Sequence, residues 1–212
     1  MLDALDRAGG RLFGIAVPSP DASAGDLEAM HERGVRGVRC NLINPGGLPP
    51  AVAIEWQPIL RALGWHVELQ VAIDELDSPA AFVASFGVPV VVDHMGRPSP
   101  GRVDPASPSL RALIDLVRDD GCFVKLSAPY RLSSSPAPWP DVTPLARALV
   151  AANARRCLWG SDWPHVDTTS DVRMDDLIDA LSAWCGDPAE RSLATGENPQ
   201  QLFGKSSARA PH

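Results

Sequence analysis

Two side chains suited to acid–base chemistry stand where apolar segments of this chain end. His94 occurs in VVVDHMGRP and Asp162 in LWGSDWPH. A carboxylate can accept a proton from water as the water attacks a carbonyl carbon, and an imidazole can polarise that carbonyl or stabilise the resulting oxyanion. The alternatives are a structural histidine and an aspartate that caps a helix or lies in a loop.

Cationic side chains lie close to the ends of other apolar segments. Arg39 occurs in VRCN, Arg97 in HMGRP and Arg131 in PYRLS. Because a guanidinium group binds a carboxylate through two parallel hydrogen bonds, three converging arginines would select an acidic ligand. The alternative for each single arginine is a surface residue with a solvated head group. His165, in DWPH, either orients Asp162 or closes the loop that follows it.

Six apolar segments supply the elements that must position these residues. Each leads through a loop rich in Gly and Pro to a segment with helical periodicity, which predicts parallel βα units with ligands bound beyond the carboxyl ends of the strands. The predicted strands are Leu12–Val17, Val35–Asn41, Trp65–Val71, Val88–His94, Cys122–Ser127 and Arg156–Asp162. The predicted helices are Leu2–Arg7, Gly25–Arg33, Val52–Leu63, Pro79–Ser85, Leu110–Arg118, Pro144–Ala152 and Asp175–Trp184.

Alternation along two of the predicted strands places polar side chains on a common face. Glu68 and Gln70 share a face of HVELQV, and Phe123, Lys125 and Ser127 share a face of CFVKLS. Since alternate strands fill the same interior layer of a barrel, we expect Lys125 to pair with Glu68 inside it.

The composition excludes several classes of protein. The 212 residues are 45% hydrophobic and carry a net charge of −7 without a basic stripe, which argues against nucleic-acid binding and leaves small-molecule chemistry open. No signal peptide and no bilayer-spanning run is visible, so we expect a cytoplasmic protein without a membrane partner. The four cysteines lack metal-type spacing, and we expect buried thiols rather than disulfides. We expect one domain over residues 1–204 and a disordered tail over 205–212, with the oligomeric state left open.

Six fragments, in order along the chain, resemble the amidohydrolase superfamily. They are GVRGVRCNL, LGWHVELQ, VVVDHMGRP, VKLSAPYRLS, LWGSDWPH and ENPQQLFG. The resemblance is to the amidohydrolase-2 branch, which contains 2-pyrone-4,6-dicarboxylate lactonase and related sugar-lactone hydrolases. It implies a (β/α)8 TIM barrel that hydrolyses a lactone, or a similar cyclic ester, bearing carboxylates.

The resemblance also implies roles for individual residues. Asp162 would act as the general base on water and His94 as the group that polarises the carbonyl. The residues that bind substrate would be Arg39, Arg97, Arg131, Gln70 and His165. Gln70 stands where the dicarboxylate enzyme has a tyrosine, and no further arginine follows VRCNL. A monocarboxylate or a polyhydroxy lactone is therefore an alternative substrate.

Two features of the family are missing from this sequence. The His-x-His motif that normally ends the first barrel strand occurs nowhere in it, and six βα units in 212 residues fall short of the about 250 residues of an eight-unit barrel. We therefore expect a barrel N-terminally truncated to about six units, the alternative being a complete open sheet of six. Many relatives hold a divalent metal partly through His-x-His, and we expect no tightly bound metal or other cofactor here. The alternative functions are an amidohydrolase-related decarboxylase and a catalytically inactive fragment.

Overall fold

The computed structural model describes residues 1–166, 168 and 171–204, and these contain one sheet of six parallel strands. Each strand pairs with the next one along the chain, from β1 to β6. The strands are β1 (Gly14–Ala16), β2 (Val35–Asn41), β3 (His66–Gln70), β4 (Val90–Val92), β5 (Phe123–Leu126) and β6 (Cys157–Trp159). Each lies inside one of the predicted strands, so the predicted βα pattern is confirmed.

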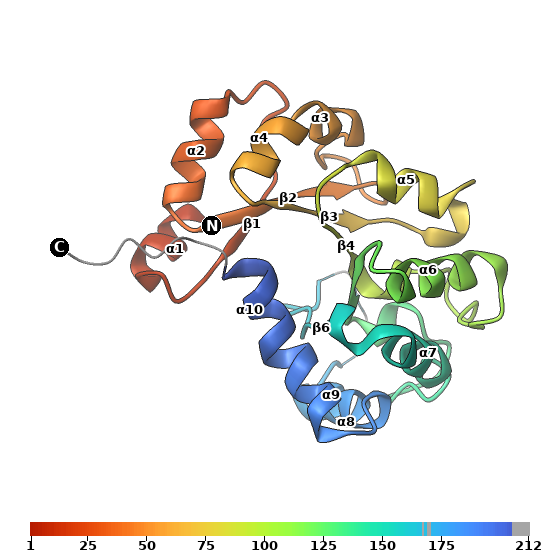
Figure 1. Cartoon of the computed structure of the whole chain (residues 1–212). Coiled ribbons are helices and arrows are strands. Elements are labelled where there is room, and N and C mark those ends of the chain that lie inside the picture. Colours follow the sequence, from red (N-terminus) through yellow and green to blue (C-terminus); the bar gives the residue numbers. More distant parts are fainter. Residues whose placement is uncertain (167, 169–170, 205–212) are drawn as a thin grey trace.

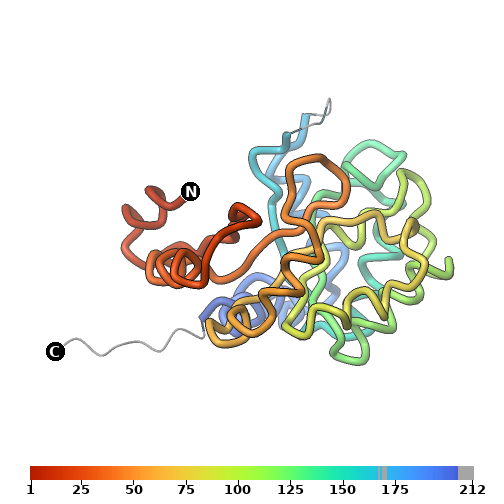
Figure 2. Tube along the Cα trace, turned by 90° about the horizontal axis from the view of Figure 1, so that it is seen from above, coloured from red at the N-terminus to blue at the C-terminus, as the bar shows by residue number. Residues whose placement is uncertain are grey.

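The sheet is curved into a half-barrel, with most of the helices along its convex side and α10 on its concave side (Figure 1). The helices are α1 (Leu2–Ala8), α2 (Ala24–Glu32), α3 (Pro50–Glu55), α4 (Gln57–Ala62), α5 (Pro79–Ser85), α6 (Pro108–Arg118), α7 (Thr143–Asn153), α8 (Met174–Trp184), α9 (Pro188–Ser192) and α10 (Asn198–Phe203). Figure 2 shows α1 and α2 on the opposite side of the molecule from α6 and α7. The truncation of a closed barrel stays a prediction, and the predicted tail, residues 205–212, lies outside the described residues.

One predicted helix is wrong as a single element. The segment Val52–Leu63 forms two short helices, because α3 ends at Glu55 and α4 begins at Gln57. Pro58 lies in the first turn of α4. Proline has no amide hydrogen and its ring clashes with the carbonyl group four residues earlier, so a continuous helix cannot pass through this position.

The two faces of the sheet have different chemistry. The convex face packs against amphipathic helices such as α6, whose buried residues Leu110, Leu113, Ile114 and Val117 follow the helical repeat. The concave face has a small apolar cluster formed by Val91, Phe123 and Leu158 from the strands with Leu202 from α10. Charged side chains lie on the same concave face, nearer the carboxyl ends of the strands.

Two further expectations concern the cysteines and the membrane. All four cysteines are free thiols in buried positions, as predicted. In the described part of the chain, no helix combines the length and the apolar character needed to cross a bilayer.

Candidate active site

The carboxyl ends of the strands bring His94 and Asp162 together. His94 lies in the turn that directly follows β4, and Asp162 lies in the loop after β6. Nε2 of His94 is 3.8 Å from Oδ1 of Asp162. The His94 side chain is 6% exposed and the Asp162 side chain 21% exposed, so the pair is largely sheltered from water but open on the aspartate side. The predicted meeting of these two residues is confirmed.

His94 is aimed by an unusual backbone turn. The short helical segment η2 (Asp93–Gly96) contains His94 with φ 52° and Met95 with φ 53°, both in the left-handed region. Each non-glycine residue there costs about 1–2 kcal/mol and persists only where its surroundings hold it. Met95 is fully buried, and Ser127 Oγ lies 2.8 Å from His94 Nδ1. This contact fixes the ring with Nε2 toward Asp162.

Asp162 is held through one of its two carboxylate oxygens. Oδ2 accepts hydrogen bonds from the Tyr130 hydroxyl at 2.5 Å and from Arg131 Nε at 3.0 Å. Both donors belong to η3 (Pro129–Arg131), which follows β5. Burial would raise the pKa of Asp162, but the hydrogen bonds from Tyr130 and Arg131 and the charge of Arg131 hold it below the usual carboxyl value. The carboxylate is therefore ionised at neutral pH, with Oδ1 facing His94.

The protonation of His94 is set mainly by its burial, which lowers its pKa. The nearby carboxylates of Asp93 and Asp162 act in the opposite direction. The cations of Lys125 and Arg39 lower the pKa of His94 further. At neutral pH the imidazole is neutral, so it can donate a hydrogen bond from one nitrogen while accepting one at the other.

Two of the three predicted arginines hold carboxylates at this site, and each holds a different one. Arg39 donates to Asp93 Oδ2 at 2.6 Å. Arg131 binds Asp162, and its second nitrogen donates to the carbonyl oxygen of Val166 at 2.6 Å. Arg97 immediately follows the His94 turn, with φ 41° and a half-buried side chain. Arg131 thus contacts the candidate base itself.

The remaining two predicted binding residues differ in their surroundings. Gln70 is buried at the end of β3, opposite Asn41 of β2. His165 Nε2 lies 3.0 Å from the carbonyl oxygen of Ser161, and its backbone amide donates to the carbonyl oxygen of Asp162. These bonds favour the interpretation that His165 closes the loop around Asp162.

Beneath the pair, the expected contact between Lys125 and Glu68 is confirmed. Lys125 Nζ lies 2.6 Å from Glu68 Oε1 and also 3.0 Å from Asp93 Oδ1. Burial would raise the pKa of Glu68, but Lys125 and His66 lower it to about 2. Both carboxylates of this layer are nearly inaccessible, Glu68 at 4% and Asp93 at 1% exposed.

Sequence reasoning missed Tyr130, Asp93 and the role of Ser127 at the site. Tyr130 is the chain's single tyrosine and directly precedes Arg131, so its position after a strand was a usable signal. Asp93 directly precedes His94, and nothing in the sequence singles it out from the other residues of the predicted strand Val88–His94. No pattern in the sequence indicates that Ser127 would meet His94 Nδ1.

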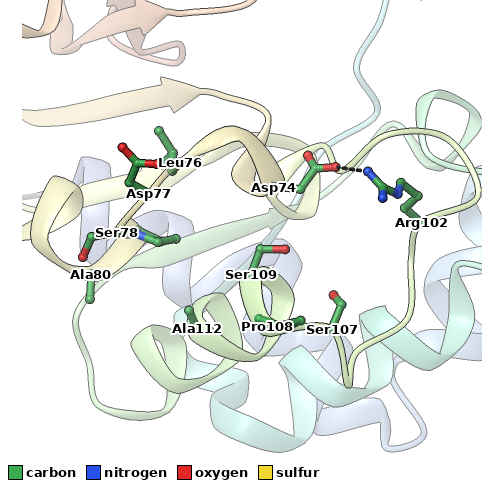
Figure 3. A pocket seen from close by; sticks show the side chains of 11 residues that line it. Asp74, Leu76, Asp77, Ser78, Ala80, Arg102, Ser107, Pro108, Ser109 and Ala112 are labelled. Atoms are coloured by element: carbon green, nitrogen blue, oxygen red, sulfur yellow. Dashed lines mark ion pairs between the residues drawn. The ribbon is translucent and has the colours of Figure 1, made fainter.

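A separate hollow lies between η1 (Ile73–Glu75), α5 and the start of α6 (Figure 3). Its volume is about 580 Å³, and Asp74 in its wall faces Arg102 at 3.8 Å. Neither His94 nor Asp162 lines it. We assign the candidate active site by the convergence of acid–base groups, since this hollow holds no comparable pair.

The donor set around the pair does not suit a divalent metal. Among residues 1–166, 168 and 171–204, no cluster of three or more His, Cys, Asp or Glu side chains is placed to hold one. The carboxylates closest to His94 are engaged by cations, Asp93 by Arg39 and Asp162 by Arg131. We therefore route no chemical step through a metal.

Comparison with known proteins gives consistent matches. The family model described as Amidohydrolase matches residues 1–205. The 4-sulfomuconolactone hydrolase of Hydrogenophaga intermedia is 34% identical, over 96% of this chain and 69% of its own length. The 2-pyrone-4,6-dicarboxylate hydrolase of Comamonas testosteroni is 31% identical, over 96% and 70%. A crystal structure of a probable 2-pyrone-4,6-dicarboxylic acid hydrolase from Acinetobacter baumannii, with citric acid bound, has a TM-score of 0.80 and 27% identity, over 96% of this chain and 77% of its own.

Proposed function

The chain belongs to the amidohydrolase family of enzymes, and we propose that it hydrolyses a lactone, or a related cyclic ester, of a carboxylate-bearing substrate. The observation that carries the proposal is the His94–Asp162 pair, in which Tyr130 and Arg131 hold one carboxylate oxygen and the other faces the imidazole. Two relatives named as hydrolases of a lactone and of a pyrone support the choice of bond.

Asp162 acts as the general base. Its Oδ1 takes a proton from a water molecule while the water oxygen bonds to the lactone carbonyl carbon and the carbonyl π electrons move onto oxygen. When the tetrahedral intermediate collapses, the bond from carbon to the ring oxygen breaks, and the proton held by Asp162 passes to that oxygen. The product carries a carboxyl and a hydroxyl group, and Asp162 is ionised again.

His94 stabilises the oxyanion. When the Ser127 hydroxyl donates to Nδ1, the proton of the neutral ring resides on Nε2, the nitrogen that faces Asp162. From there it donates a hydrogen bond to the carbonyl oxygen as negative charge develops. The lowered pKa of His94, which follows from its burial, keeps the ring in this neutral form.

The arginines supply the preference for anionic substrates. The Arg39 side chain is 34% exposed although it holds Asp93, so part of it remains accessible to a ligand. Arg97 lies directly after the His94 turn and offers a second cation. The citric acid bound to the Acinetobacter relative is a polycarboxylate and supports this substrate class. Arg131, Gln70 and His165 complete the proposed binding residues. We place the reaction in the cytoplasm.

The test compares two variants that each replace one carboxylate by an amide. Purified protein is incubated with lactones that carry one or two carboxylates. Ring opening is measured from the protons that the reaction releases. Asp162→Asn lowers kcat/KM by about 10²- to 10⁴-fold, the usual contribution of a general base. The matched control is Asp74→Asn, which also faces an arginine but lies at the separate hollow and keeps kcat/KM within about twofold of the wild type.

Three outcomes contradict the proposal. Unchanged turnover in Asp162→Asn refutes the base. Release of carbon dioxide in place of a ring-opened product favours the decarboxylase alternative. A wild-type chain that opens none of the lactones favours the inactive alternative.

A further inference from the structure

Four charged side chains from four consecutive strand units form a layer beneath the candidate active site. Arg39 of β2 pairs in register with Glu68 of β3, and Glu68 pairs with Val91 of β4. Val91 in turn pairs with Phe123 of β5. Asp93 lies two residues after Val91, and Lys125 lies two residues after Phe123. Because side chains two apart share a face, all four charges point to the concave side. We call Arg39, Glu68, Asp93 and Lys125 the inner charged layer.

Lys125 links the two carboxylates of this layer. Its Nζ lies 2.6 Å from Glu68 Oε1 and 3.0 Å from Asp93 Oδ1. Arg39 holds the other oxygen of Asp93 at 2.6 Å. Asp93 therefore contacts a cation on each side. The layer contains two positive and two negative charges, and its two carboxylates, Glu68 at 4% and Asp93 at 1% exposed, are nearly inaccessible to water.

Strand β5 and the residue after it hold two consecutive residues of the His94 turn. Lys125 contacts Asp93, and Ser127, two positions further on, contacts His94. Asp93 is the first residue of the turn whose next two residues have left-handed backbone angles. A turn of this kind relaxes unless neighbouring groups restrain it. The ammonium group and the hydroxyl group supply restraint at successive positions.

The choice of lysine at this position is itself informative. The chain has 19 basic residues of the Lys and Arg types, and only Lys125 and Lys205 are lysines. A compact ammonium group with three donors can bind two carboxylates at an angle to one another, whereas the planar guanidinium group suits one carboxylate presented side on. In a chain whose basic residues are nearly all arginine, a lysine occupies the position between the carboxylates of Glu68 and Asp93.

We propose that Lys125 is a positioning residue: it grips Asp93 and thereby holds the turn that aims His94 at Asp162. The inference rests on the proposed function only in taking His94 as the working group. Lys125 touches no reacting atom in this scheme and acts through Asp93.

The same contact affects the charge around His94. The charged groups facing the imidazole are Asp93 from its own turn, Asp162 from the loop after β6, Lys125 from β5 and Arg39 from β2. Lys125 is one of the two cations that lower the pKa of His94, while Asp93 raises it. Removing the lysine charge with Asp93 still present therefore raises the pKa of His94.

The test removes one positive and one negative charge together. Lys125→Met alone would leave Glu68 buried without its cation, and such a variant risks misfolding. The double variant Lys125→Met/Glu68→Gln keeps similar side-chain volumes and leaves Asp93 paired with Arg39. The matched control is Arg156→Met/Asp120→Asn, which removes an ion pair of 2.7 Å formed by residues that precede β6 and β5.

Three measurements are made on both double variants and on the wild type. Thermal unfolding checks that each variant folds. The His94 imidazole is titrated by NMR without substrate, and its signal is assigned with His94→Gln. Steady-state kinetics then give kcat and KM separately. In the Lys125/Glu68 variant we expect the pKa of His94 to rise and kcat to fall about 10- to 100-fold with KM within about threefold, the pattern of a displaced catalytic group. The control variant changes neither the pKa of His94 nor kcat.

A folded Lys125/Glu68 variant with the wild-type His94 titration and the wild-type kcat overturns the inference. A change in unfolding temperature alone also overturns it, because a purely structural role would move stability and leave His94 unaffected. If the wild type opens no lactone but the His94 titration shifts as expected, the proposed function fails while the influence of Lys125 on His94 stands.

Discussion

The chain's single tyrosine gives a direct optical test of the contact with Asp162. Tyr130 is the only tyrosine in 212 residues, so the near-ultraviolet absorbance of phenolate reports one group. Burial raises the pKa of Tyr130, and the hydrogen bond to Asp162 and its negative charge raise it further, against the opposing charge of Arg131. We expect the folded protein to show no phenolate at pH ~10, where a free tyrosine is half ionised.

This shift makes stability depend on alkaline pH in a defined direction. Near pH ~10 the unfolded chain releases the phenol proton while the folded chain retains it. The stabilisation linked to Tyr130 is therefore fully present below pH ~10 and is lost as the pH rises toward the folded-state pKa. The loss is at most about 1.4 kcal/mol per pH unit. Since the phenol is only partly buried and Arg131 opposes the shift, the measured slope should be smaller.

Asp162→Asn is the diagnostic perturbation. The amide removes the negative charge, so the pKa of Tyr130 falls toward the ordinary tyrosine value. Phenolate absorbance is titrated in the wild type and the variant, with circular dichroism to confirm that both stay folded and denaturant unfolding at several alkaline pH values to measure the slope. A folded wild type that forms phenolate near pH ~10, or a variant with an unchanged midpoint, would refute the described contact.

Two further predictions concern the His94 turn and metal content. Gly96→Ala should lower the free energy of unfolding by about 2–3 kcal/mol, because Gly96 has φ +80° and a Cβ there would lie 2.9 Å from Leu113 and 3.0 Å from Ile73. Gly46→Ala is the control in urea unfolding, since its φ is +89° but nothing lies within 4 Å; equal losses in the two variants would show that crowding at Gly96 does not matter. Elemental analysis should find less than stoichiometric zinc or manganese, and a chelator should leave activity unchanged; one tightly held ion per chain would contradict the reading of the donor set.

Strand alternation and parallel order were sufficient to predict the main contacts. His94 and Asp162 end apolar segments, and parallel strands bring such ends to one edge, which is why their meeting followed from the sequence. Lys125 and Glu68 could be paired for the same reason, because period-two alternation fixes the face of each side chain.

The contacts that were missed depend on turns, which periodicity does not describe. Asp162 itself has φ 56°, and only this backbone angle and the short η3 segment bring Tyr130 and Arg131 to its Oδ2. The left-handed residues of the His94 turn are a histidine and a methionine, and neither is the glycine that usually marks such a conformation in a sequence. Arg131 contacts the candidate base through its Nε at 3.0 Å, and its role in binding substrate stays a prediction.

The inner charged layer has a consequence for how the sheet assembles. Its members come from units that are far apart in sequence, so the full set of attractions is available only after all four of those units have docked in correct alignment. A strand that slipped by one position would turn its charged side chain into the apolar layer between the sheet and the helices. Burying an unpaired charge there is unfavourable. Misaligned folding intermediates are therefore less stable than the correctly aligned sheet. The inner charged layer thus also favours the correct strand register during folding.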